Sequence, residues 1–425
     1  MPQIHREADA MDVDSSLPQP YELPAEIWAK ILDFATYVPF ATDTTAPTPF
    51  AYPGTPSQDD IREDLRRLLP TKRSITEVCK QWYTIGVPLL YRCVYLRSHK
   101  VGPLLTSVKD KPDYLLHTVR FDWVFTHELI GHDIVEAIKH FPNLTIFTSR
   151  LPPKQIGNRL ATPMHPTNFG YNLHETCRML KVIDCDHMLF YDEYNMQAEA
   201  VNSASIMSLL NSAPLTQLRC RFVNTDNPIE LKMNSIELLS LMPQVQQEQS
   251  NVTFTTNLPH LAHLVYCPIG PLDPQFLMCK SFDLTSLELN LDHDTAITDW
   301  ETVDEVKKVT RMFPLLENLI IRRRPWDQLF ATLNLPYIQR IGMILSRKIL
   351  HGNELELLLA DICSADAPKL RAVRFLDRSH AESLRRRYHS YTLEKMAPLY
   401  AKRGIAVEDC FGKCLFSTSP LEFGN

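Results

Sequence analysis

Two stretches near the start of the chain carry apolar residues at helical spacing. Ile27, Ile31 and Phe34 make one apolar stripe in the first stretch, and Trp28, Leu32 and Ala35 make an adjoining one. They recur every three or four residues, which predicts a helix with one wide apolar face. Pro24 suits the first turn of this helix, where its missing N–H is not needed. The apolar arc is wider than a small domain of its own can cover.

The second stretch opens on residues 74–77, Ser-Ile-Thr-Glu, which is the pattern of a capping box at the start of a helix. The apolar residues that follow at helical spacing are Val78, Trp82 and Ile85. We expect Gly86 to end this helix. Residues 88–91, which include Leu89, then begin a further turn, and residues 94–96 favour a strand.

A polar, proline-rich insert separates the two stretches. Residues 38–57 hold several prolines among threonines and alanines. Such a composition cannot bury a core, so we expect the insert to loop out into solvent. Residues 61–69 then predict a short amphipathic helix, which Pro70 is expected to end.

The two stretches together resemble the F-box. Its usual form is Leu-Pro-x-Glu-Ile at the start and Val-Cys-x-x-Trp in a later helix. The matching residues here are Leu23, Pro24, Glu26, Ile27, Val78, Cys79 and Trp82. The sequence around them looks like the F-box proteins common in mushroom-forming fungi. The insert makes the segment longer than an ordinary F-box.

The resemblance implies that this segment binds the Skp adaptor of a cullin-based SCF ubiquitin ligase. The residues expected to contact the adaptor are Leu23, Pro24, Ile27, Trp28, Ile31, Leu32, Val78, Cys79, Trp82 and Leu89. The alternative is an ordinary three-helix core, which suits Val78 and Ile85 best. We favour a partner-facing surface, because so short a bundle interrupted by an insert cannot bury all of these side chains.

The rest of the chain repeats one unit, an amphipathic helix followed by a proline and a leucine-rich strand. The clearest copies are residues 134–150, 206–223, 306–323 and 357–376, and residues 178–184 and 282–291 fit as strands without the proline. A period of roughly 20 to 36 residues is typical of a leucine-rich-repeat-like solenoid, in which stacked units share one core. The usual repeated Asn is missing, so we expect an irregular array.

These patterns predict an α/β protein with three parts. They are a disordered N-terminus at residues 1–20, an all-helical F-box-like domain at 21–97 and an irregular βα solenoid at 98–425. The polar residues 243–256 suit a loop or an eroded repeat. Residues 382–402 predict a charged terminal helix that Gly404 caps, before a last strand.

Composition narrows the class of protein. The chain has 425 residues, 44% of them hydrophobic, and a formal net charge of −6, which argues against general nucleic-acid binding. It contains no apolar run of about 18 residues, so no membrane span is expected, and residues 1–20 lack the centre of a signal peptide. The ten cysteines are scattered, which suits reduced thiols in the cytoplasm or nucleus.

Motifs for chemistry are few. There are only 12 glycines and no Gly-x-Gly pair, so no nucleotide loop is available, and no hydrolase elbow occurs. The isolated pairs Cys410 and Cys414, His260 and His263, and Cys185 and His187 lack a second pair at zinc spacing. We therefore expect no catalytic residues, metal or cofactor.

Two basic runs are candidates for binding a substrate. Arg322, Arg323 and Arg324, followed by Trp326, leave a predicted strand, and a second run lies at residues 385–389. Guanidinium groups suit phosphate and carboxylate, so the first run predicts a site for an acidic or phosphorylated protein segment. The alternative is a solvated strand end.

The sequence thus predicts a non-enzymatic substrate adaptor of an SCF ubiquitin ligase, with an unknown protein substrate held by the repeats. An F-box scaffold that acts outside ubiquitination is the first alternative. The second is an enzyme or nucleic-acid-binding protein housed in the repeats, which would need a polar cluster with shifted pKa values or a continuous basic face.

Overall fold

A computed structural model of the whole chain defines the fold. The residues that it describes are 23–45, 50, 56, 58–124, 131–150, 169–188, 209–222, 229–243, 254–266, 284–291, 299–323, 329–345, 352–378, 383–384 and 387–416. Residues 1–20, predicted to be disordered, lie outside these ranges.

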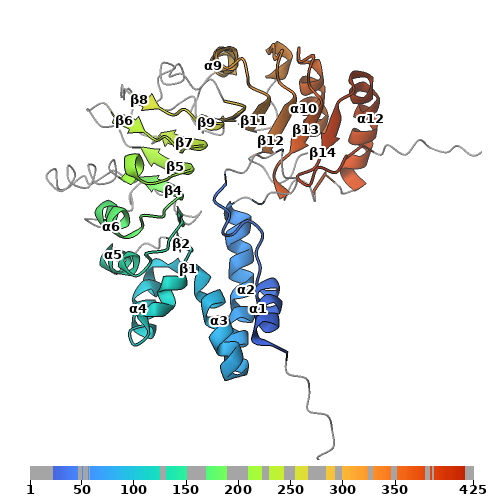
Figure 1. Ribbon diagram of the computed structural model, residues 1–425. Helices are drawn as coiled ribbons and strands as arrows, with labels where there is room; N and C mark the ends of the chain where they lie inside the picture. Colours follow the sequence, from blue (N-terminus) through green and yellow to red (C-terminus); the bar gives the residue numbers. More distant parts are fainter. Residues whose placement is uncertain are drawn as a thin grey trace, which may run out of the picture.

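Twelve parallel strands form one sheet, and they pair in the order in which they follow in the chain. The strands are β1 Cys93–Arg97, β2 Arg120–Val124, β3 Ile146–Arg150, β4 Val182–Met188, β5 Gln217–Phe222, β7 Leu238–Pro243, β9 His263–Tyr266, β10 Ser286–Asn290, β11 Asn318–Arg323, β12 Arg340–Leu345, β13 Ala372–Phe375 and β14 Ala406–Glu408. Figure 1 shows the sheet curved into an arc with helices outside it. The α/β class is therefore confirmed.

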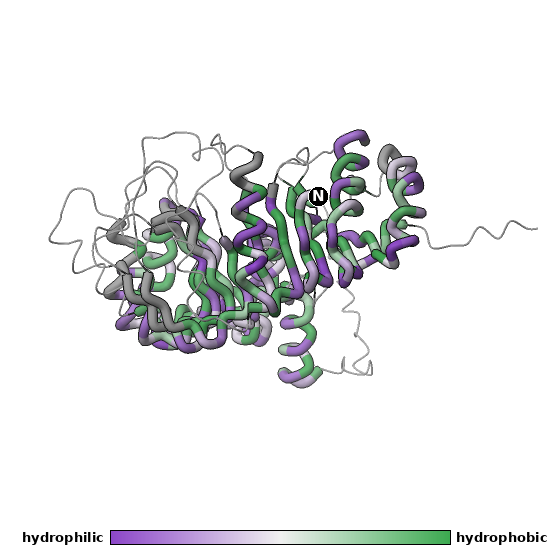
Figure 2. The backbone as a smooth tube through the Cα atoms, turned by 90° about the horizontal axis from the view of Figure 1, so that it is seen from above, coloured by the Kyte–Doolittle hydropathy of each residue, from purple (hydrophilic) through white to green (hydrophobic). Residues whose placement is uncertain are grey.

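The two faces of the sheet differ in polarity. On the outer face, alternate residues such as Phe121, Leu287 and Val373 join one continuous apolar core with the helices. On the inner, concave face the intervening positions are largely polar or charged. The tube in Figure 2 shows hydrophobic and hydrophilic positions alternating along the strands. This period of two is what a strand imposes when its two faces meet different surroundings.

Helices cover the outer face. They are α4 Val101–Ser107, α5 Gly131–Lys139, α6 Phe169–Thr176, α9 Asp299–Met312, α10 Gly352–Ser364 and α12 Arg387–Arg403, with the 3₁₀ turns η1 Ser98–Lys100, η2 Pro112–His117 and η4 Phe330–Thr332. The predicted order of helix, proline and strand is confirmed at Pro142, between α5 and β3, and at Pro314, between α9 and β11. Gly404 has a φ of 68° directly after α12, as its predicted capping role requires.

Three helices precede the sheet: α1 Ala25–Ala35, α2 Gln58–Val78 and α3 Lys80–Arg92. The prediction for α1 is confirmed, but two boundaries were wrong. Neither Pro70 nor Ser74 interrupts the helix, because both lie inside α2. The new helix instead begins after Cys79, whose extended backbone separates α2 from α3.

Gly86 does not end a helix either, because it lies inside α3. A Cβ at this position would come 2.8 Å from Cγ2 of Ile75 on α2. The glycine therefore allows α3 to approach α2 closely, which explains its place within a helix.

The described residues of the insert, 38–45, 50 and 56, do not all face solvent, although its composition predicted that it would loop out. Val38, Ala41 and Phe50 are each about one-twentieth exposed or less, at 5%, 4% and 5%. Val38 and Ala41 form a small apolar cluster with Ile61 and Leu65 of α2. Composition alone did not predict this burial, because other parts of the chain supply the apolar surface that the insert itself lacks.

Two short strands, β6 Ile229–Lys232 and β8 Phe254–Asn257, pair in parallel outside the main sheet. β8 begins within the polar segment 243–256, which was predicted as a loop or an eroded repeat. In the part of the chain that the structure describes, no helix has the length and apolar character needed to cross a membrane.

Candidate functional site

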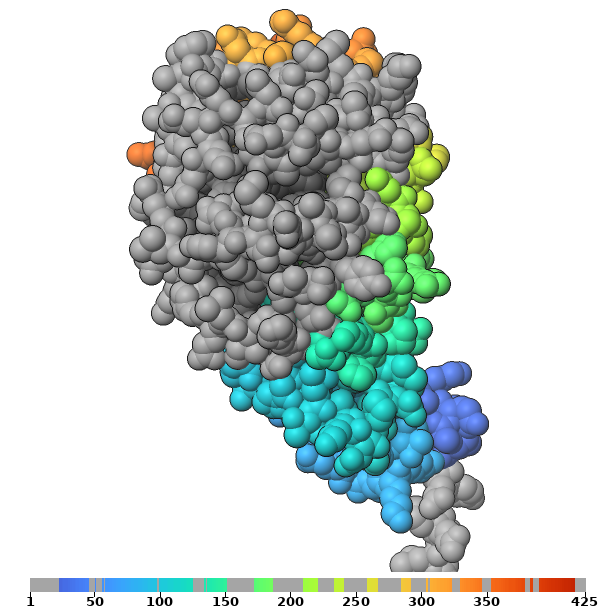
Figure 3. Space-filling view, turned by 90° about the vertical axis from the view of Figure 1, so that its left-hand side faces the viewer, coloured from blue at the N-terminus to red at the C-terminus, as the bar shows by residue number. Residues whose placement is uncertain are grey.

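One side of α1 presents a row of exposed apolar side chains, which we call the apolar patch. It consists of Leu23, Ile27, Ile31 and Phe34, which are 39%, 40%, 43% and 85% exposed. Ile27, Ile31 and Phe34 share one helical face because they are four and three residues apart, and Leu23 lies just before the helix begins. Figure 3 shows the blue colours of α1 to α3 at the lower end of the molecule, beside the cyan and teal part of the chain. The exposed fractions of its side chains leave the patch open to a partner.

The other residues predicted to face a partner lie in mixed surroundings. Pro24 and Cys79 are exposed, and Val78 is 59% exposed, so a core role for Val78 was wrong. Trp28 and Trp82 are half-buried, and their rings pack against each other with centroids 4.8 Å apart. This contact joins α1 to α3 and supports the apolar patch from behind.

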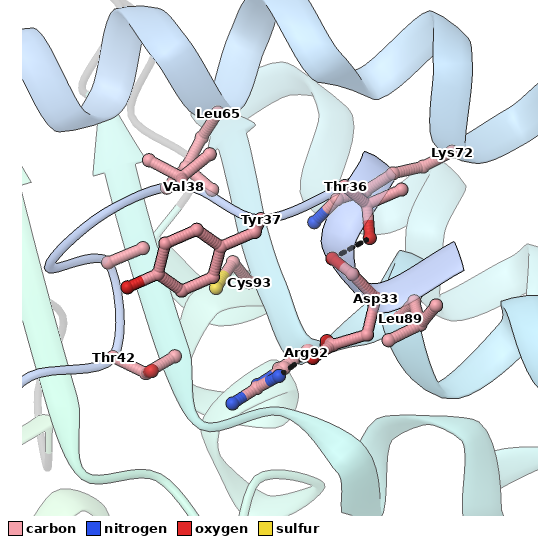
Figure 4. A pocket seen from close by; sticks show the side chains of 11 residues that line it. Asp33, Thr36, Tyr37, Val38, Thr42, Leu65, Lys72, Leu89, Arg92 and Cys93 are labelled. Atoms are coloured by element: carbon pink, nitrogen blue, oxygen red, sulfur yellow. Dashed lines mark hydrogen bonds and ion pairs between the residues drawn. The ribbon is translucent and has the colours of Figure 1, made fainter. Parts of the chain in front are cut away.

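Two of the predicted contact residues point elsewhere. Leu32 is only 3% exposed, since it faces inward from α1. Leu89 is half-buried and lines a small pocket between α1, α2, α3 and β1, shown in Figure 4. The helical pattern did not separate these side chains from their neighbours, because the apolar arc of α1 is wide enough to serve both its inner and its outer side.

The pocket contains a buried lysine. Lys72 of α2 lies near Cys93 and near Asp33, whose carboxylate is 3.1 Å from Nη1 of Arg92. Burial lowers the pKa of Lys72, although the nearby Cys93 and Asp33 partly oppose this effect. Burial likewise raises the pKa of Cys93. The cysteine is thus held as a thiol, which is the unreactive form.

The concave face begins with a closed network at β2. Arg120 donates from Nε and Nη2 to the carboxylate of Asp122, at 2.7 and 2.8 Å, and both side chains are fully buried. Thr148 of β3 also donates to Asp122. The charges of the buried pair compensate each other, as burial requires.

The same arrangement recurs along the arc. Arg150 holds Asp184 with two hydrogen bonds of 2.8 Å, and Arg322 holds Glu288 at 3.2 and 3.3 Å. Burial alone would raise the pKa values of both carboxyl groups, but the guanidinium groups around them, including Arg219, bring both below their usual range. Both therefore remain carboxylates at neutral pH.

The last strands continue this pattern. Arg374 of β13 donates from Nε to Glu408 of β14 at 2.8 Å. Across the described concave face, each of these arginines is paired with a carboxylate.

The helix α2 enters the concave side and meets the sheet at both ends of the arc (Figure 1). Arg62 lies 3.6 Å from Asp122 on β2, and Asp59 lies 3.9 Å from Arg150 on β3. Asp64 lies 3.9 Å from Arg378, just after β13. Side chains of one helix thereby connect strands from the start and the end of the sheet.

The predicted basic site is only partly described. Arg322 contributes to the Glu288 pair, so it is not available as an isolated cation. Arg323 ends β11, and Arg324 and Trp326 lie outside the described residues, as do residues 385–386 of the second run. Within the described ranges, no group of three His, Cys, Asp or Glu side chains is arranged to hold a metal.

The charged row of the concave face was not predicted from the sequence. Alternating polar residues in otherwise apolar strands, such as Arg120 and Asp122 or Ser286 and Glu288, were its only signal. Comparison of the chain with family models gives no match, and a search of curated proteins also finds no similar protein.

Proposed function

We propose that this protein is the substrate-recognition adaptor of an SCF-type ubiquitin ligase, with an F-box in α1 to α3 and a leucine-rich-repeat-like solenoid in the curved sheet. The apolar patch would bind the Skp adaptor, and the concave face would hold a protein substrate for ubiquitin transfer by other subunits. The protein itself would catalyse no reaction. Such a role belongs in the cytoplasm or nucleus.

The exposed apolar patch is the observation that supports this proposal best. Four large apolar side chains exposed close together are costly to leave in water, and such a patch marks a protein interface. Leu23 and Ile27 are also positions of the motif that resembles an F-box. Trp28 and Trp82 give the row a rigid base, as a preformed interface needs.

A binding measurement with the purified Skp adaptor tests the proposal. The double variant with Leu23→Ala and Pro24→Ala should bind at least tenfold more weakly in a calorimetric titration. Tenfold corresponds to about 1.4 kcal/mol, and an apolar side chain buried at the centre of an interface contributes about 1 to 3 kcal/mol. Leu357→Ala, at an exposed position on α10, is the matched control and should bind normally. Equal affinity of all three proteins would refute the proposed surface.

The choice between a ligase subunit and a scaffold depends on the cullin. If the wild-type protein captures the Skp adaptor from cells together with a cullin, the ligase assignment is supported. Capture of the adaptor without a cullin would favour a scaffold outside ubiquitination.

A further inference from the structure

The insert contacts the concave face through its backbone. Nη1 of Arg120 donates to the carbonyl of Ala41 at 3.2 Å. Farther along the arc, Nε2 of Gln217 donates to the carbonyls of Thr44 and Thr45, at 3.3 and 2.6 Å. Side chains of the sheet thus bind main-chain oxygens of the insert, which any extended polypeptide also offers.

At the far end of the arc, the insert places one aromatic ring in a slot. The ring of Phe50 lies 5.4 Å from the guanidinium carbon of Arg374 and 5.9 Å from that of Arg340, within range of cation–π attraction. Nη1 of Arg374 also donates to the carbonyl of Phe50 at 3.3 Å. Gly342 provides room, since a Cβ there would lie 3.2 Å from the ring.

Between these two contacts, the floor of the concave face has unused polar groups. His263, Ser286 and Asn318 are in register on β9, β10 and β11, and Ser240 lies on β7. All four are buried, and in the described structure each has a side-chain polar atom without a hydrogen-bond partner. Buried polar atoms without partners are costly, and they mark places where a ligand can add hydrogen bonds.

We propose that the concave face is a binding site for an extended polypeptide segment with a Phe or Tyr side chain, and that residues 41–45 and Phe50 of the insert occupy it as an intramolecular ligand. The partner's segment would place its aromatic ring between Arg340 and Arg374. Its polar side chains would bind His263 and its neighbours on the floor. Only the identification of this partner as a substrate rests on the proposed function.

The intramolecular ligand competes by proximity. A segment attached to its site has an effective concentration in the millimolar range, so it reduces the apparent affinity for a free ligand. Weakening the attached segment should therefore strengthen the binding of a free peptide.

The test uses the full chain and a fluorescently labelled peptide with the sequence of residues 38–57. In fluorescence anisotropy, the variant Phe50→Ala should bind this peptide at least tenfold more tightly than the wild type does. Adding Arg374→Gln to that variant should reverse most of the gain. Tyr391→Ala, which removes an exposed aromatic ring from α12, is the matched control and should resemble the wild type.

A second variant, with residues 41–57 replaced by a Gly/Ser linker of equal length, should bind the peptide at least as tightly as Phe50→Ala. If both variants bind no better than the wild type, the proposal is overturned and the insert is a fixed structural element. Failure of both variants to give folded, monodisperse protein would lead to the same conclusion.

Titrating the same proteins with the Skp adaptor separates this inference from the proposed function. Phe50→Ala and the linker variant should keep adaptor affinity within a few-fold. The double variant with Leu23→Ala and Pro24→Ala should lose adaptor affinity while its peptide binding remains that of the wild type. Each proposal can therefore fail while the other stands.

Discussion

His263 makes the stability of the sheet depend on pH. Its ring is fully enclosed on the concave face, and neither ring nitrogen has a hydrogen-bond partner among the described residues. Burial lowers its pKa from 6.5 to about 4, because an imidazolium ion there would lose its hydration; Glu288 opposes this effect and Arg219 adds to it. The folded protein therefore keeps His263 neutral in mildly acidic solution.

The size of this change in the free energy of unfolding follows from proton linkage. Below pH 6.5 the unfolded chain protonates this histidine while the folded chain does not, so the free energy of unfolding falls as the pH decreases towards 4. One unit of pKa difference corresponds to about 1.36 kcal/mol, so His263 should cost about 2 kcal/mol between pH 7 and pH 5. The lowered pKa values of Asp184 and Glu288 act mainly below this range, where these carboxylates begin to protonate.

Urea denaturation at pH 7 and pH 5 measures this effect. The loss of stability on acidification should be about 2 kcal/mol smaller for His263→Gln than for the wild type. His260→Gln, at an exposed position three residues earlier, is the matched control and should behave as the wild type does. If the wild type and His263→Gln lose the same stability, the ring is not held neutral and the reasoning fails. An NMR titration of the histidines in the wild type measures the pKa of His263 independently.

Two further substitutions should lower the free energy of unfolding. Gly342→Ala would bring a Cβ 2.7 Å from Cδ1 of Leu376 and also close to Phe50. We therefore expect urea denaturation to show a loss of about 1 to 3 kcal/mol in the free energy of unfolding. No loss would mean that these side chains move aside. Asp361→Ala would remove the carboxylate that accepts three backbone N–H groups at the start of η4, at 2.8 to 2.9 Å, and should cost about 3 kcal/mol. Asp361→Asn should cost less, and equal losses for the two Asp361 variants would contradict this explanation.

The elements of the array could be predicted because each depends on local signals. Pro142 and Pro314 mark the turns between helix and strand, and the apolar period changes there from helical to strand-like. The ends of α2 could not be predicted from such local signals. Pro70 removes only one helical hydrogen bond, and the packing of Ile61, Leu65 and Ile75 maintains the helix on both sides of it.

The candidate site was predictable only in part. The row formed by Ile27, Ile31 and Phe34 follows from helical spacing alone. The slot for Phe50 does not, because it joins residues more than 300 positions apart in the chain, Phe50 and Arg374. No local pattern reports a contact between a proline-rich segment and side chains that distant, and the composition of the segment pointed to solvent instead.

The contact between the insert and both ends of the arc has a consequence for how the protein folds. A sheet whose strands pair only with their neighbours in the chain behaves as a linear array, which can lose structure from either end without disturbing the middle. Contacts of the insert and α2 with β2, β5 and β13 add a closed loop of long-range interactions to that array. We expect these contacts to form late, since closing so long a loop is slow, and to make the two ends of the sheet unfold together.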